Sequence, residues 1–131
     1  MKLTVIGLGL IGGSMAKDLR KAGFAHEITG VDANPENAQE ALRLGIIDRI
    51  DSLESAVAKA DMVIIAIPVD KVLNTLTKVL DLISDQTTVI DVGSTKKLIA
   101  EAVENHPKRR NYIPAHPMSG TENSGPTAAL E

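Results

Sequence analysis

The sequence predicts an α/β fold in which a doubly wound, mainly parallel sheet carries helices on both faces. Short aliphatic runs alternate with helix-like patterns from the first residue to about Ala115, and this alternation is typical of repeated β-α units. The chain of 131 residues is 44% hydrophobic but only 2% aromatic, as expected for strands that are buried on both faces. We therefore expect one compact domain over residues 1–115 and a loop over residues 116–131.

Each predicted strand is a short aliphatic run that ends at a turn signal. The run from Met62 to Ile67 is so apolar that it should be a central strand, and Pro68 ends it. The run at 47–50 has the least regular pattern. The expected strands cover residues 3–6, 27–32, 47–50, 62–67, 88–92 and 112–115.

The predicted helices have apolar residues three and four positions apart and recognisable caps. Pro35 suits the first turn of a helix, where its missing N–H costs nothing, and Ala38, Ala41 and Leu42 would then face inward as far as Gly45. The strongest apolar period is that of Val69, Val72, Leu73, Leu76, Val79 or Leu80, and Ile83. The expected helices cover residues 12–22, 35–44, 52–58, 69–83 and 96–104, and Ser52 is expected to cap the third.

The composition argues against several classes of function. A net charge of −3 with scattered basic residues disfavours a nucleic-acid partner. The chain has no cysteine, so a disulfide scaffold and a thiolate metal site are excluded. The apolar start lacks a cleavage-site pattern, and no apolar stretch approaches the roughly 20 residues of a membrane span. We expect a soluble cytoplasmic protein without a membrane partner and without a metal.

A G-x-G-x-x-G motif, formed by Gly7, Gly9 and Gly12, follows the first strand and opens the first helix. A turn without side chains lets backbone N–H groups approach a pyrophosphate, whose charge the helix N-terminus stabilises. In this context the motif predicts a dinucleotide-binding domain of the Rossmann type. Leu10 and Ile11, which lie in this turn, are also expected to bind the cofactor. An ordinary strand-to-helix turn is the alternative.

Asp32 ends the second predicted strand, 20 positions after Gly12, where a carboxylate can accept hydrogen bonds from the ribose hydroxyls of NAD. No Arg or Lys follows directly to hold a 2′-phosphate, so NAD is favoured over NADP. An alternative is that Asp32 caps the helix at Pro35. Pro68, after the most apolar strand, is expected to shape the loop beneath the nicotinamide, or else it simply terminates the strand.

Two further segments carry a resemblance to a known family. They are Asp91-Val92-Gly93-Ser94-Thr95-Lys96-Lys97 and the stretch from Pro114 through His116-Pro117-Met118-Ser119-Gly120 to Pro126. With the opening glycine motif, they resemble the prephenate dehydrogenase family, which includes arogenate dehydrogenases. The His-Pro-Met-Ser-Gly stretch is the specific part, because many dehydrogenases share the glycine motif. FAD proteins share that motif too, and this stretch argues for a nicotinamide enzyme.

The resemblance implies NAD-dependent oxidation of a ring hydroxyl and loss of carbon dioxide, which converts prephenate to 4-hydroxyphenylpyruvate in tyrosine biosynthesis. His116 would accept the proton of the substrate hydroxyl and Ser94 would hydrogen-bond nearby, so these two are the expected catalytic residues. The alternatives are a surface or packed residue for His116, and a helix cap followed by exposed cations for the segment from Ser94 to Lys96. His26 and His106 lack such a setting and are expected to be solvated.

Family members continue into a helical second domain that supplies dimer contacts and an arginine for the substrate carboxylate. We expect this C-terminal domain to be absent from the chain, with 116–131 leading toward it and a homodimer in the full-length enzyme. The isolated chain would then bind NAD but turn over prephenate poorly or not at all. An arogenate dehydrogenase, a nucleotide-binding fragment without catalysis and a hydroxyacid dehydrogenase are the alternatives.

Overall fold

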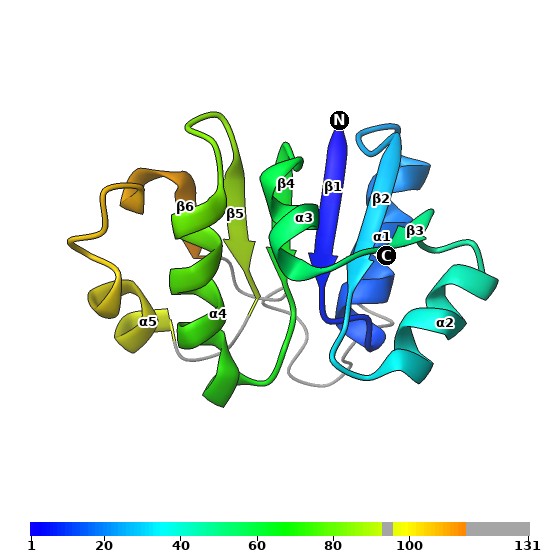
Figure 1. Ribbon diagram of the computed structural model, residues 1–131, viewed down its shortest axis with the longest axis horizontal. Coiled ribbons are helices and arrows are strands. Elements are labelled where there is room, and N and C mark those ends of the chain that lie inside the picture. The colour runs from blue at the N-terminus through cyan, green and yellow to red at the C-terminus, as the bar shows by residue number, and fades with distance from the viewer. Residues whose placement is uncertain (93–95, 115–131) are drawn as a thin grey trace.

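The structure, a computed structural model, describes residues 1–92 and 96–114 (Figure 1). Its strands are β1 (Lys2–Ile6), β2 (Glu27–Val31), β3 (Arg49–Ile50), β4 (Met62–Ile65), β5 (Thr88–Asp91) and β6 (Tyr112–Pro114). They form one sheet in the order β3-β2-β1-β4-β5-β6, and every pair is parallel. The predicted doubly wound sheet is confirmed, and the order of the strands reverses between β1 and β4.

Helices cover both faces of this sheet (Figure 1). They are α1 (Leu10–Lys21), α2 (Pro35–Arg43), α3 (Leu53–Ala58), α4 (Val69–Leu82) and α5 (Lys96–Ala102), with a 3-10 turn, η1 (Arg109–Asn111), before β6. α1 and α2 pack against one face through small residues such as Ala16 and Ala38, whereas α3, α4 and α5 pack against the other. None of the helices in the described part has the length and apolar character that crossing a bilayer requires.

The two faces of the strands supply two separate layers of core. Val63 and Ile65 of β4 pack on the side of α4, and Ile64 between them packs on the side of α1; all three are fully buried. Successive residues of a strand point to opposite faces, so one aliphatic run serves both layers. The continuous apolar pattern of β4 therefore follows from its central place in the sheet.

Several boundaries and faces differ from the predictions. α1 begins at Leu10, two positions earlier than expected, because Gly9 takes the N-cap position. Leu42 was expected to face inward, but it is 37% exposed because the small Ala38 and Ala41 fill the contact with the sheet. The predicted Ser52 cap is confirmed, since its hydroxyl accepts the N–H of Ser55.

The burial of α4 also differs in part from what its apolar pattern predicts. Val72, Leu76, Val79 and Leu80 are fully buried, as the period predicts. Val69 and Leu73 belong to the same period, but they are 43% and 40% exposed. The helix therefore buries a narrower stripe than the sequence indicates.

His106 corrects another expectation, because it is packed and not solvated. Its side chain is 14% exposed, and its Nε2 lies 2.7 Å from Oδ1 of Asp81 at the end of α4. Nδ1 accepts the backbone N–H of Lys108 at 3.0 Å, so in the neutral ring the proton resides on Nε2 and is donated to Asp81. His26 is exposed, as expected, with Nδ1 2.6 Å from the amino group of Met1.

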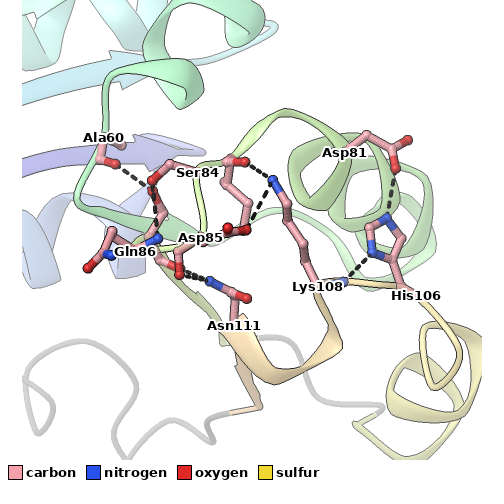
Figure 2. A network of polar contacts seen from close by, with 10 residues as sticks. Ala60, Asp81, Ser84, Asp85, Gln86, His106, Lys108 and Asn111 are labelled. Carbon is pink, nitrogen blue, oxygen red and sulfur yellow. Dashed lines mark hydrogen bonds and ion pairs between the residues drawn. The ribbon is translucent and has the colours of Figure 1, made fainter.

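The contacts of His106 belong to a polar network between the segment that precedes β6 and the turn that precedes β5 (Figure 2). The Nδ2 group of Asn111 donates to the carbonyls of Asp85 and Thr87, at 2.9 and 2.8 Å. Lys108 donates through Nζ to the carbonyl of Ile83, which follows the C-terminus of α4. The network therefore fixes where β6 starts beside β5.

Candidate dinucleotide-binding site

The glycine turn between β1 and α1 is built as the motif predicts. Gly7 has a φ of +99°, in the left-handed region, and a Cβ at this position would lie 2.2 Å from the carbonyl oxygen of Ala66. Glycine is the residue that this conformation favours, and any side chain would meet the backbone that follows β4. Gly7 thus lets the chain turn sharply beside β4.

The other two glycines have different roles. A Cβ at Gly12 would lie 2.0 Å from the carbonyl oxygen of Gly7, so the absence of a side chain permits α1 to start this close to the turn. A Cβ at Gly9 would meet nothing within 4 Å. Gly9 is therefore the open position at which a ligand could approach the backbone, as the second glycine does in this motif.

The N-terminus of α1 has the properties of an anion site. No side chain caps it, since Gly9 is the N-cap, and no acidic residue lies in its first turn. The first N–H groups of a helix have no partner within the helix, and the helix dipole favours negative charge there. Leu10 is 75% exposed and Ile11 is 38% exposed, so both leave this end of α1 accessible.

Asp32 directly follows β2 at the same edge of the sheet. Its Oδ2 accepts the backbone N–H of Leu8 at 2.7 Å, and its Oδ1 accepts that of Asn34 at 2.8 Å. Asp32 does not cap α2, because Asn34 is the N-cap and its Oδ1 accepts the N–H of Glu36 at 2.9 Å. The helix-cap interpretation of Asp32 is therefore wrong.

Two adjoining cavities lie along the edge where the strands end, the edge toward which the arrows in Figure 1 point. One, of about 440 Å³, is lined by Gly9, Leu10, Ile11, Ala66, Ile67, Pro68 and Val92. The other, of about 630 Å³, includes Gly7, Gly9, Asp32, Asn34, Asp51, Leu53, Pro68 and Lys71 in its lining. They share Gly9, Ala66, Ile67 and Pro68. The pair spans the point where the strand order reverses, which is the usual ligand position in such sheets.

The larger cavity is negatively charged on balance at neutral pH. Asp51 accepts the N–H of Ser52 at 2.8 Å; this bond, followed by the hydrogen bond with the side chain of Ser55, lowers the pKa of the Asp51 carboxyl. Asp32 is the second carboxylate in the described lining, and Lys71 is the one cation in it. Two carboxylates disfavour an additional phosphate on the bound nucleotide.

Pro68 stands where the two cavities meet. It is the N-cap of α4, and its carbonyl accepts the N–H of Lys71 at 2.9 Å. Its placement fits both earlier interpretations, because it lines the cavities and follows the end of β4. Gly13 and Ser14, in the first half of α1, line a different hollow between α1 and α2, and the N–H of Gly13 donates to the carbonyl of Gly9.

The two expected catalytic residues, Ser94 and His116, lie outside the described residues, and so does the side chain of Lys96. The strands that lead to Ser94 and His116 are described. Asp91, the last residue of β5, is in register with Pro114, the last residue of β6.

Sequence reasoning missed several lining residues. Asp51 follows β3, Ala66 and Ile67 follow β4, and Lys71 lies in α4. A signal was present, because the carboxyl ends of parallel strands gather at one edge of the sheet. The residues at the end of each predicted strand and those directly after it, which include Ala66, Ile67 and Asp51, were therefore candidates as a group, whereas Lys71, inside a predicted helix, was not. In the described part, no cluster of acidic, histidine or cysteine side chains is suited to a metal ion.

The fold and this edge define a dinucleotide-binding domain of the Rossmann type. The family model described as "Prephenate dehydrogenase, nucleotide-binding domain" matches residues 15–131. The chain belongs to this family. The match begins after the glycine turn, but the curated prephenate dehydrogenase of Bacillus subtilis is 43% identical over all of this chain, so that alignment includes the turn.

Solved structures agree with this assignment. Prephenate dehydrogenase from A. aeolicus, in complex with hydroxyphenyl propionate and NAD+, is 35% identical with a TM-score of 0.82 over 97% of this chain. Arogenate dehydrogenase from Synechocystis is 34% identical with a TM-score of 0.77 over 89%. The chain spans 37% of the Bacillus protein and 45% and 41% of the two solved chains.

Proposed function

We propose that this chain is the NAD-binding part of a prephenate dehydrogenase, which oxidises and decarboxylates prephenate to 4-hydroxyphenylpyruvate. The observation that carries the proposal is the edge on which the open Gly9, the N-terminus of α1 and Asp32 line adjoining cavities. Residues 1–115 would form the nucleotide domain, and 116–131 would lead toward the substrate. The family membership and the NAD+ in the A. aeolicus complex support this.

The charges at the ribose end support NAD over NADP. Asp32 can accept the hydroxyl groups of a ribose, whereas a 2′-phosphate would meet its negative charge. Asp51 adds a second carboxylate to the same cavity. Bound NAD would supply the hydride acceptor. The protein would hold the pyrophosphate at Gly9, Leu10 and Ile11.

In the proposed reaction, His116 takes the proton of the substrate hydroxyl while the carbinol hydride leaves toward the nicotinamide. The ring then loses carbon dioxide and becomes aromatic. Ser94 hydrogen-bonds beside this pair. The register of Asp91 with Pro114 supports the assignment, because the segments that carry the two residues leave the sheet at neighbouring points. The neutral imidazole is the form that can take this proton.

Prephenate is preferred over arogenate as the substrate because the relative with 43% identity is a prephenate dehydrogenase. Arogenate dehydrogenase is the second candidate, since the Synechocystis structure is one at 34% identity. A nucleotide-binding chain without catalysis is the third. We also propose a homodimer of the full-length enzyme and a cytoplasmic location, which rest on the family resemblance. Light scattering of the full-length enzyme after size-exclusion chromatography tests the dimer.

The cofactor is tested by calorimetric titration of the chain with NAD and with NADP, repeated on Asp32→Ala. We expect tighter binding of NAD, and the substitution should weaken this binding and narrow the preference. Asp48→Ala is the control, because Asp48, like Asp32, accepts a backbone N–H through its carboxylate, that of Ile28 in β2 at 2.8 Å, but is not in the lining of either cavity. Equal binding of both nucleotides by the unaltered chain would contradict the NAD assignment.

The reaction is tested by NADH formation with prephenate and, separately, with arogenate. We expect prephenate to be the better substrate and His116→Asn to abolish turnover while the affinity for NAD is kept. Faster turnover of arogenate would support the second candidate. A full-length enzyme that binds NAD but oxidises neither compound would support the nucleotide-binding alternative, whereas the isolated chain is expected to oxidise prephenate poorly or not at all.

A further inference from the structure

Asp32 has contacts that ribose recognition alone does not require. Both of its carboxylate oxygens accept backbone N–H groups, one from Leu8 in the glycine turn and one from Asn34. The bond to Leu8 links residues 24 positions apart in the sequence, and its 2.7 Å length is typical of a hydrogen bond to a charged acceptor. The ribose end of the site is therefore tied directly to the pyrophosphate end.

Leu8 is the residue through which the turn is fastened. Its side chain is 8% exposed and belongs to the core layer beneath α1 and α2. A Cβ on Gly30 of β2 would lie 2.7 Å from Cδ1 of Leu8, so this glycine makes the space that Leu8 fills. The preceding N–H, that of Gly7, donates to the carbonyl of Val31 at 2.8 Å. The end of β2 thus holds two consecutive N–H groups of the turn.

Gly9, the position at which a ligand could approach the backbone, comes next in the chain. Gly9, directly after Leu8, is the N-cap of α1 and has nothing within 4 Å of where a Cβ would be. A shift of Leu8 would therefore move the backbone that faces the pyrophosphate. Hydrogen bonds to charged groups contribute more than neutral ones, so the Asp32 bond is a strong restraint on this backbone.

We propose that Asp32 is a positioning residue for the glycine turn as well as the ribose acceptor, so that ribose and pyrophosphate recognition are coupled through the N–H of Leu8. This inference rests on the proposed NAD site. The two roles are compatible, because an ionised carboxylate has about four lone-pair sites and two are used by the backbone. Asp32 also lines the larger cavity, so its remaining lone-pair sites can accept hydrogen bonds from a ribose bound there.

A chemical double cycle separates the two roles. Asp32→Ala and the unaltered chain are each titrated with NAD and with an NAD analogue whose adenosine ribose lacks both hydroxyls. If Asp32 acted only through the ribose, the two proteins would bind the analogue equally. We expect Asp32→Ala to bind the analogue about tenfold more weakly, as the loss of one charge-assisted bond implies.

Amide hydrogen exchange in the ligand-free chain gives a second readout that does not depend on NAD. In Asp32→Ala the N–H of Leu8 should exchange about tenfold faster or more, whereas that of Ile28 should not change. Asp48→Ala should give the reverse pattern, since Asp48 accepts the N–H of Ile28. Asp32→Asn keeps the shape but loses the charge and replaces one of the two acceptor oxygens by an NH2 donor, so it should give effects of the same kind; it serves if the alanine variant does not fold.

The proposal requires both results. Equal binding of the analogue by the two proteins, or unchanged exchange at Leu8, would overturn it. Absence of NAD binding by the unaltered chain would count against the proposed function, and the exchange of Leu8 would then decide the positioning role by itself.

Discussion

The hydroxyl of Tyr112 donates a hydrogen bond to the carboxylate of Asp91, with 3.1 Å between the two oxygens. Both residues are buried, with 2% and 0% of their surfaces exposed. The bond joins β6 to β5 within three residues of the end of each strand. It therefore braces the two strands whose next residues lead to Ser94 and His116.

Replacing Tyr112 by Phe should lower the free energy of unfolding at neutral pH by about 1–3 kcal/mol, because a hydrogen bond to a buried carboxylate is lost. Urea unfolding of the two proteins measures this difference. A variant as stable as the unaltered chain would mean that the bond contributes nothing.

The same pair predicts a pH dependence. Burial, followed by the charge of Asp91 and the hydrogen bond to it, raises the pKa of Tyr112 well above its ordinary value. The protonated phenol is favoured in the folded state, so its contribution to the free energy of unfolding is fully present below the unfolded pKa of about 10. Above that pH the contribution is lost at about 1.4 kcal/mol per pH unit. The stability gap to Tyr112→Phe should therefore narrow above pH ~10. Tyr112 is the one tyrosine in a chain without tryptophan, so phenolate absorbance reports its ionisation directly.

Gly9→Ala and Gly12→Ala should separate ligand binding from folding. The Gly9 variant should lose about 1 kcal/mol or less, because a Cβ meets nothing there, but its affinity for NAD should fall roughly tenfold or more. The Gly12 variant should be destabilised by about 3 kcal/mol or more, since its Cβ would lie 2.0 Å from the carbonyl oxygen of Gly7. Thermal unfolding and NAD titration check both. Unchanged NAD affinity in Gly9→Ala would contradict the assigned pyrophosphate position.

Asn111→Ala should destabilise the chain by about 1–3 kcal/mol, because the carbonyls of Asp85 and Thr87 both lose a donor. Gln86→Ala, in the same turn, is the control: Gln86 is exposed and contributes only its backbone N–H to the network. Its effect should stay within about 0.5 kcal/mol. Equal effects of the two substitutions would show that the network (Figure 2) does not hold β6.

Two leucines of α4 test the narrow buried stripe. Leu76 is fully buried, so Leu76→Ala should cost about 2–5 kcal/mol. Leu73 is 40% exposed, and Leu73→Ala should cost less than about 1 kcal/mol. Denaturant unfolding gives the free energy of unfolding of both variants, which can be compared if their m values are equal. A large loss of stability in Leu73→Ala would indicate that the side of α4 that carries Leu73 is buried in solution.

The sequence by itself determined the elements and the edge at which they meet. β-α alternation, the glycine spacing and the position of Asp32 are local patterns, and each one predicts its own segment without knowledge of the neighbours. The order of functional segments along the chain follows from these patterns as well, since the ends of parallel strands gather at one edge.

Only the tertiary structure decided which groups touch. The bond from Leu8 to Asp32, the approach of Gly12 to the Gly7 carbonyl and the packing of His106 against Asp81 join segments or surfaces whose distance no periodicity encodes. Leu42 shows the same point in reverse, because it fits the apolar period of α2 and yet lies largely outside the contact. A period states which side of an element is apolar, whereas burial and hydrogen bonding depend on the shape of whatever packs against that side.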